Sequence, residues 1–328
     1  MTPGYWLKES DKLRDRANTL RNSGTSKQNM TPRRKRIYEG QLKEAEKLDD
    51  LAACCIGMAD ESRPPSPYFV FVRTVNHLRA ILEGFDNATL NAVFLTTPAM
   101  RDAAKKVLIE MVAKYRDPEQ AKADEIKKME LELVGLKIPG FFPTPPDVVE
   151  LMIRCADIGP DVKKILEPSA GKGDLIAAAQ KAAPWAEIHW CEHSHALVNL
   201  LTKRFEGTGH LKARDVDGGI WYDFLKTKPD QSYDLVLMNP PFESGQDVQH
   251  VIHAFKYLKP NGRLVAIMSE GPFFRSDKLS EEWRQFAAIA GAYIQKLPAG
   301  SFKSAFVPTG VNTRLVVIDA SQKAVAAA

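Results

Sequence analysis

The first third of the chain carries apolar and small side chains at helical intervals. From Tyr38 they recur in steps of three and four, which places them on one face of a helix. Thr31-Pro32, just before this run, is typical of an N-cap followed by a first-turn proline. Residues 99–134 repeat the helical pattern, with a break near Asp117-Pro118. The first face is made by Leu42, Ala45, Leu48, Ala52, Cys55 and Ala59.

The segment between these helical stretches is less regular. Arg63-Pro64-Pro65-Ser66-Pro67 predicts a helix stop and a linker or tight connection. Tyr68–Val72 fits either a short strand or the start of a buried helix. We predict a mainly helical N-terminal domain over residues 1–137, which would hold a nucleic acid or another partner.

After Ile138-Pro139-Gly140, short apolar runs begin to alternate with helical segments. This alternation predicts an α/β domain whose mostly parallel sheet is covered by helices on both faces. In such sheets the ligand lies beyond the carboxyl ends of the strands, where the strand order reverses. We assign the domain to residues 138–320 and a tail to 321–328. The predicted strands are 164–167, 187–192, 233–238, 262–268, 293–297 and 312–318, and the predicted helices are 174–183, 194–205, 246–258 and 279–290.

Composition is that of an ordinary globular protein, with 44% hydrophobic and 26% charged residues. No apolar run approaches the roughly 18 residues of a membrane span, and residues 1–15 are too polar for a secretory signal. The four cysteines, Cys54, Cys55, Cys155 and Cys191, have no spacing typical of a disulfide framework or a zinc site. We therefore expect reduced thiols and a cytoplasmic protein.

Positive charge is concentrated near the N-terminus. Residues 1–48 carry 12 basic and 6 acidic side chains, whereas residues 141–328 carry 21 of each. The densest run is Arg33-Arg34-Lys35-Arg36. A basic patch outside a neutral catalytic body would concentrate a polyanionic substrate. A solvated helix surface is the alternative for such a run.

The first predicted strand leads into a turn rich in small residues, Glu167-Pro168-Ser169-Ala170-Gly171-Lys172-Gly173-Asp174. Small residues let a ligand approach the backbone, and the following helix start offers unpaired N–H groups. Similar turns hold dinucleotides or simply reverse the chain. Here the spacing is not Gly-x-Gly-x-x-Gly, and Glu167 would repel a pyrophosphate. The acid instead favours a ligand with a sulfonium or an α-amino group.

Two further acids follow strand-like runs. Glu192 closes the second predicted strand, where a carboxylate can accept hydrogen bonds from both ribose hydroxyls of an adenosine. Asp223-Phe224 combines an acid with an aromatic ring that could cover an adenine. An exposed strand-end glutamate and a plain loop acid are the alternatives.

Asn239-Pro240-Pro241-Phe242 directly follows a strongly apolar strand. Two prolines there are costly to strand pairing and fix the backbone. The Asn239 side-chain oxygen and the Pro240 carbonyl could accept both hydrogens of a planar NH₂ group. Phe242 offers a flat face to an extruded base. A structural strand stop is the alternative.

These motifs together resemble class I methyltransferases that depend on S-adenosylmethionine (SAM), especially the N6-adenine amino-methyltransferases of restriction–modification systems, phages and mobile elements. The resemblance rests on Phe141-Phe142-Pro143-Thr144-Pro145-Pro146, Glu167-Pro168-Ser169-Ala170-Gly171 and Asn239-Pro240-Pro241-Phe242, in a gamma-like order, and covers about residues 138–320. It implies a Rossmann-like, mostly parallel seven-stranded sheet. It also implies catalytic roles for Asn239, Pro240, Pro241 and Phe242, and SAM bound by Phe142, Thr144, Pro145, Glu167, Pro168, Ser169, Ala170, Gly171, Gly173, Asp174, Glu192, His193, Asp223, Phe224 and Asn239.

Further residues are assigned to binding of the target base and of the nucleic-acid backbone. Phe242, Phe273 and Phe274 would shape the base pocket, and Lys303 with Arg33–Arg36 would meet the nucleic-acid backbone. His193, His195, His250 and His253 are interpreted as surface or strand-end residues, and no metal is expected.

The leading hypothesis is DNA adenine-N6 methylation. Its sequence specificity is expected to be low or unknown, because the chain ends soon after the last predicted strand. The alternatives are an RNA base amino-methyltransferase, a protein glutamine N5-methyltransferase and an interaction module whose fused domain has lost activity. No membrane partner is expected.

Overall fold

The computed structural model describes residues 1–23, 30–62, 66–84, 86–134, 136, 138–208, 211–213, 223–303 and 310–320. It divides into two compact units, one built mainly from residues up to Leu131 and the other from Glu132 onward. Each unit has its own hydrophobic core. The predicted tail, the Arg63–Pro65 part of the linker and most of the loop after Lys303 lie outside the described residues.

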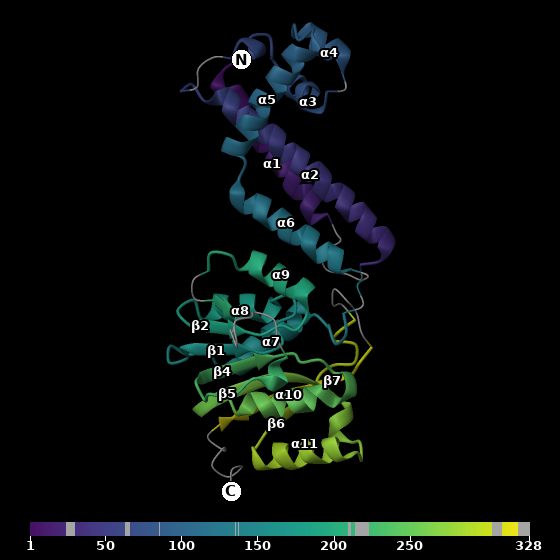
Figure 1. Cartoon of the computed structure of the whole chain (residues 1–328), viewed down its shortest axis with the longest axis vertical. Helices are drawn as coiled ribbons and strands as arrows, with labels where there is room; N and C mark the ends of the chain where they lie inside the picture. The colour runs from purple at the N-terminus through teal and green to yellow at the C-terminus, as the bar shows by residue number, and fades with distance from the viewer. Residues whose placement is uncertain are drawn as a thin grey trace. The chain divides into compact units, whose positions relative to one another are not determined.

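All regular secondary structure in the described part of the first unit is helical, in line with the mainly helical domain that the sequence predicts. Its two long helices, α1 and α2, run side by side (Figure 1). The Thr31 hydroxyl accepts the Arg34 N–H at 3.3 Å and Pro32 occupies the first turn of α2, so the predicted N-cap is confirmed. Tyr68–Val72 forms neither a strand nor an α-helix but a 3₁₀ turn over Pro67–Phe69. The helices are α1 (Pro3–Asn22), α2 (Pro32–Ala59), α3 (Val75–Glu83), α4 (Asn87–Ala92), α5 (Pro98–Tyr115) and α6 (Pro118–Leu133).

A buried ion cluster joins three of these helices. The Arg21 guanidinium of α1 contacts Asp49 of α2 and donates to both carboxylate oxygens of Asp124 of α6, at 2.7 and 2.6 Å. Burial of the guanidinium lowers the pKa of Arg21. Hydrogen bonds to the two nearly buried acids, and their charge, outweigh this effect and raise the pKa further above its usual range. Removing one partner would leave an uncompensated buried charge, so the cluster fixes how α1, α2 and α6 pack.

The second unit is an α/β sandwich built on a seven-stranded sheet in the order β3-β2-β1-β4-β5-β7-β6. The pairs from β3 to β5 are parallel, and β7 is antiparallel to both neighbours. The predicted α/β class and the mostly parallel sheet are confirmed. The elements are α7 (Pro146–Ala156), β1 (Lys164–Glu167), α8 (Asp174–Ala182), β2 (Glu187–Trp190), α9 (His195–Arg204), β3 (Leu211–Ala213), β4 (Tyr233–Met238), α10 (Gln246–Phe255), β5 (Leu258–Ser269), α11 (Lys278–Ile289), β6 (Tyr293–Lys296) and β7 (Thr313–Asp319).

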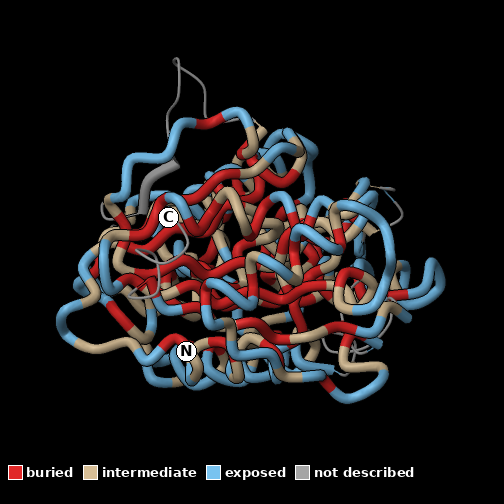
Figure 2. The backbone as a smooth tube through the Cα atoms, turned by 90° about the horizontal axis from the view of Figure 1, so that it is seen from below, coloured by how far each residue is buried: buried red, intermediate tan, exposed pale blue. Residues whose placement is uncertain are grey.

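Helices cover both faces of this sheet, which is why its central strands are apolar on both sides. The core on one face includes side chains of α7, α8 and α9, and the core on the other includes side chains of α10 and α11. Buried stretches of the chain alternate with exposed segments (Figure 2). None of the described helices is both long and apolar enough to cross a membrane.

Strand order decides where the site lies. β1 is flanked by β2 on one side and β4 on the other, so the chain changes direction across the sheet at the β1–β4 pair. The carboxyl ends of these three parallel strands meet at one edge. Glu167 ends β1, Glu192 lies two residues beyond β2, and Asn239 directly follows β4.

Candidate active site

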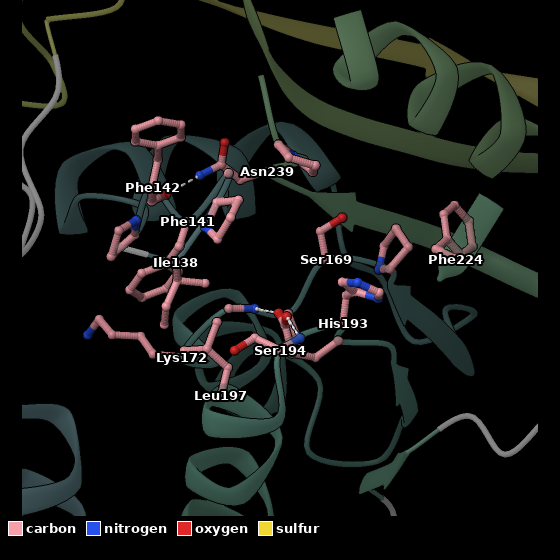
Figure 3. A pocket seen from close by; sticks show the side chains of 18 of the residues that line it. Ile138, Phe141, Phe142, Ser169, Lys172, His193, Ser194, Leu197, Phe224 and Asn239 are labelled. Carbon is pink, nitrogen blue, oxygen red and sulfur yellow. Dashed lines mark hydrogen bonds between the residues drawn. The ribbon is translucent and has the colours of Figure 1, made fainter. Parts of the chain in front are cut away.

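The carboxyl ends of β1, β2 and β4 border a cavity of about 800 Å³ (Figure 3). This volume is typical of a pocket for a cofactor or drug-sized ligand. Most of the residues predicted to bind SAM line it, whereas Pro145 and Gly173 do not. The predicted residues at the cavity are Phe142, Thr144, Glu167, Pro168, Ser169, Ala170, Gly171, Asp174, Glu192, His193, Asp223, Phe224 and Asn239.

The small-residue turn after β1 is held by its own backbone. Gly171 and Gly173 adopt left-handed φ values of 57° and 87°, and α8 begins at Asp174. A Cβ on Gly173 would lie 2.7 Å from the Phe205 ring and 2.8 Å from a Leu201 methyl carbon. Glycine at 173 is therefore required both by backbone conformation and by the close approach of α9.

Two carboxylates face the cavity at the ends of β1 and β2. Glu167 is 2% exposed, and its Oε1 accepts the Ser169 N–H at 3.0 Å. Glu192 accepts the Gly171 and Ser194 N–H groups, both at 2.8 Å. Burial raises the pKa of both acids, and the nearby Glu192 raises that of Glu167 further. A cationic ligand in the cavity would favour the ionised forms.

Asn239 is fixed by segments far away in the sequence. Its Nδ2 donates to the Phe142 carbonyl at 2.8 Å and to the Thr144 hydroxyl at 3.0 Å. Both amide hydrogens are thus engaged, which leaves Oδ1 as an oriented acceptor with no partner among the described residues. Figure 3 shows the Asn239 amide beside Phe142 at the edge of the cavity.

The rest of the Asn-Pro-Pro-Phe tetrapeptide divides between two environments. Pro241 lines the large cavity, and a Cβ on Gly140 would lie only 2.5 Å from the Pro241 Cβ. Phe242 instead stacks on Phe142, with ring centroids 5.4 Å apart and planes at 11°, and borders a second cavity of about 230 Å³. One face of the Phe242 ring is therefore covered.

The residues expected to shape a base pocket lie apart from the large cavity. The Phe273 ring packs against Trp283 on one side, and the Arg314 guanidinium lies 4.6 Å from the centroid of the Phe273 ring. Phe274 is 66% exposed. Pro272 and Arg275 of the same loop line the second cavity next to Phe242. Lys303 is exposed and lines neither cavity.

The basic run lies on the other unit, in the first turn of α2. Arg33, Arg34 and Arg36 are exposed there, and Lys35 is half-buried. No acid occupies this turn. Cations at a helix N-terminus are unfavourable to the helix, so the placement costs stability.

Buried polar atoms without a hydrogen-bond partner gather at the large cavity. Among the described residues they are Glu167 Oε2, Ser169 Oγ, Asn239 Oδ1 and His250 Nδ1. An unmade hydrogen bond on a buried group is costly, and such groups in native proteins are few. Four of them around one cavity fit a bound ligand with several polar groups and a positive charge, as SAM has.

His250 corrects the interpretation of the histidines as surface or strand-end residues. It lies on α10, is only 8% exposed and lines the cavity. Sequence reasoning placed no cavity residue on this helix, although α10 begins only four residues after Phe242 and so must start near the strand end. No group of three or more potential metal ligands occurs within the described part of the chain.

A comparison of the sequence with known protein families indicates which class of enzyme this cavity belongs to. Residues 150–292 match the family model described as the methyltransferase small domain. The second unit is a class I SAM-dependent methyltransferase domain. Its cofactor is SAM, and the cavity at the ends of β1, β2 and β4, with its two acids and unpartnered polar atoms, is where this methyltransferase would hold it.

Several solved structures are similar to this chain at low sequence identity. TYW2 from Pyrococcus horikoshii is 13% identical, with 53% of this chain and 62% of that chain covered and a TM-score of 0.37. A candidate RNA methyltransferase from Pyrococcus horikoshii is 19% identical, with 59% and 97% covered and a TM-score of 0.40. Precorrin-6y C5,15-methyltransferase from Geobacter metallireducens is 14% identical, with 54% and 89% covered and a TM-score of 0.38. Similarity at this level does not identify a methyl acceptor.

Proposed function

We propose that this methyltransferase acts on the exocyclic amino group of a nucleic-acid base, with adenine N6 in DNA as the first candidate. The observation that supports it is the Asn239 amide, whose two hydrogens are already donated to Phe142 and Thr144. The free Oδ1 can then only accept, and an acceptor is what an NH₂ group needs. A carboxylate has no hydrogen to donate to this oxygen, and a hydroxyl group has only one.

Asn239 Oδ1 and the adjacent Pro240 carbonyl would hold the two hydrogens of the amino group. That contact directs the nitrogen lone pair away from the acceptors and toward the cavity. The bound cofactor supplies an activated sulfonium methyl group. The amino nitrogen would take this methyl group as the sulfur–carbon bond breaks, the electron pair of that bond would stay on sulfur, and the methylated nitrogen would lose a proton to water.

Orientation and electrostatics supply the acceleration in this proposal. Asn239 is held by two hydrogen bonds and the double proline, so little reorganisation is needed when positive charge develops on the nitrogen. Glu167 and Glu192 would hold the cationic and ribose parts of the cofactor at the other strand ends. Asp223 and Phe224 would hold its adenine.

Reaching a base inside a duplex requires flipping it out of the stack, at a cost of a few kcal/mol. The exposed cations Arg33, Arg34 and Arg36 at the start of α2 support a polyanionic partner, because they are placed where the helix dipole disfavours them. Binding to phosphates would offset that cost.

Isotopically labelled SAM tests the proposal. The protein is incubated separately with duplex DNA, single-stranded DNA, ribosomal RNA and a release factor, and labelled nucleosides are identified after digestion. We expect label in N6-methyl-2′-deoxyadenosine from DNA. Label only in RNA would move the substrate class to RNA, and label only in protein would overturn the proposal.

Asn239→Ala tests the role of the acceptor. Loss of an oriented hydrogen-bonding group at a reacting centre costs about 100-fold to 1,000-fold in kcat, whereas affinity for SAM should stay within a few fold. Turnover at the wild-type rate would refute the assigned role.

A further inference from the structure

We propose that the imidazole of His250 hydrogen-bonds to the adenine ring of bound SAM and so helps the site select adenine. This rests on the placement of the cofactor adenine near Asp223 and Phe224 given above. It does not depend on which acceptor is methylated.

His250 lies at the adenine end of the cavity. It projects from the second turn of α10 and lines the cavity together with Asp223 and Phe224. Its ring centroid is 5.8 Å from that of Phe224, with the planes tilted by 59°. A purine bound against Phe224 would therefore have the edge of an imidazole within reach.

The ring nitrogens of His250 have no hydrogen-bond partner among the described residues. No hydrogen bond joins its ring to any described residue, and Nδ1 is sealed from solvent. Such an unpaired buried atom is costly and rare in native proteins, and in His250 it belongs to a residue that lines the cavity. The unpaired ring indicates a ligand that completes it.

The environment keeps this imidazole neutral. Burial lowers the pKa of His250 to about 4, although the carboxylate of Asp223 opposes the shift and His253 adds to it. A neutral imidazole has one donor and one acceptor. Adenine offers both an N6 amino donor and an N7 acceptor, so either tautomer finds a complement.

The next histidine on the same helix shows the contrast. His253 lies one turn further along and does not line the cavity. Its ring packs edge-on against Phe224 and Tyr257, at centroid distances of 4.9 and 5.4 Å, and its buried Nε2 also has no partner among the described residues. His253 is thus a packing residue and a matched control for His250.

The test compares His250→Phe, His250→Gln and His253→Phe in binding to S-adenosylhomocysteine by titration calorimetry. His250→Phe keeps an aromatic ring but cannot hydrogen-bond, so we expect its dissociation constant to rise about 3-fold to 10-fold. His250→Gln should stay closer to wild type, and His253→Phe should bind as wild type does.

Two modified ligands identify the contact. S-inosylhomocysteine has an oxo group in place of the 6-amino group, and the 7-deaza analogue lacks the N7 acceptor. The wild-type protein should bind at least one of them more weakly than S-adenosylhomocysteine, and His250→Phe should lose part of that discrimination. Unchanged affinity and unchanged discrimination in His250→Phe would overturn the proposal.

Stability separates a ligand contact from a packing role. Because His250→Phe removes an unpaired buried polar group, the ligand-free melting temperature should rise while the affinity falls. If His250→Phe and His253→Phe instead lowered the melting temperature and the affinity to the same extent, His250 would only pack, and the proposal would be overturned. No nucleic acid is present in these measurements, so their failure is distinct from failure of the proposed methyl acceptor.

Discussion

At the scale of single residues, the site is organised by groups whose hydrogen bonds are incomplete. Glu167, Asn239 and His250 each present a buried atom without a partner to the same cavity. Such groups lower the stability of the ligand-free protein and raise affinity for a complementary ligand. Substitutions here should therefore change stability and binding in opposite directions.

Thr144 positions the Asn239 amide through its hydroxyl, which accepts an Nδ2 hydrogen at 3.0 Å. Thr144→Val keeps the shape but removes that acceptor, so the amide can rotate and Oδ1 loses its fixed direction. We expect kcat to fall about 5-fold to 30-fold, as 1–2 kcal/mol implies, with the KM for SAM little changed. Thr144→Ser should restore kcat. Equal kinetics of Thr144→Val and wild type would contradict this role.

The raised pKa of Glu167 predicts that both the stability of the protein and its affinity for SAM depend on pH. Its pKa in the folded, ligand-free protein is raised above 4.5 by burial, so its contribution to stability is complete below the unfolded pKa and is lost as pH rises through the folded pKa. The ligand-free melting temperature at neutral pH should therefore be higher in Glu167→Gln. Conversely, SAM should bind the wild type more weakly as pH falls through the raised pKa, and the glutamine variant should lack this dependence. Calorimetry across pH checks both signs.

At the scale of elements, turns at the strand ends place these groups, and glycines make the turns possible. The Gly173 backbone is left-handed and begins α8 against Phe205 and Leu201 of the α9 region. The Gly140 backbone lies against Pro241. Both contacts join segments that are distant in sequence, so side chains there would displace the site.

Gly173→Ala tests the first contact. The added methyl meets two side chains and forces a left-handed conformation on alanine, so we expect a loss of about 1–3 kcal/mol in stability. Gly159→Ala is the matched control, because its backbone needs no positive φ and no atom lies within 4 Å of the added carbon. Urea denaturation of both variants measures the difference; equal stabilities would show that the turn tolerates a side chain.

At the scale of the whole molecule, charge and catalysis are separated along the chain. The catalytic half is neutral, and the excess of positive charge lies in the helical unit. For a polyanionic substrate, the helical unit would supply binding affinity, and the methyltransferase unit would carry out the methyl transfer. The salt dependence of binding reports this division directly.

Neutralising Arg33 and Arg36 together should weaken DNA binding uniformly across sequences and reduce the slope of log K against log salt by up to about 2. Because these cations oppose the α2 dipole, the double glutamine variant should be at least as stable as the wild type. Lys105→Gln with Lys106→Gln on α5 is the control. If the two double variants have the same salt slope as the wild type, the run is a solvated surface.

The strand pattern alone predicted most of the catalytic fold. β1 and β4 occupy the ranges that their apolar runs predict, because buried parallel strands are continuous apolar stretches. Boundaries were less accurate where strands extend past their apolar part. β5 begins at Leu258, the last residue predicted as helix. Leu258 pairs with Tyr233 of β4, and regular pairing resumes only at Arg263, after a stretch without apolar side chains. β3 was missed because it spans only three residues.

The sequence by itself determined which chemical groups stand at strand ends: the acids Glu167 and Glu192 and the amide Asn239. Local patterns suffice for this, since each group directly follows a run whose apolar character is dictated by burial. Only the tertiary structure decided how those groups are held. It brought Thr144 and the Phe142 carbonyl to Asn239, covered one face of Phe242 and placed His250 in the cavity. These outcomes depend on contacts between residues far apart in the chain, which no local pattern encodes.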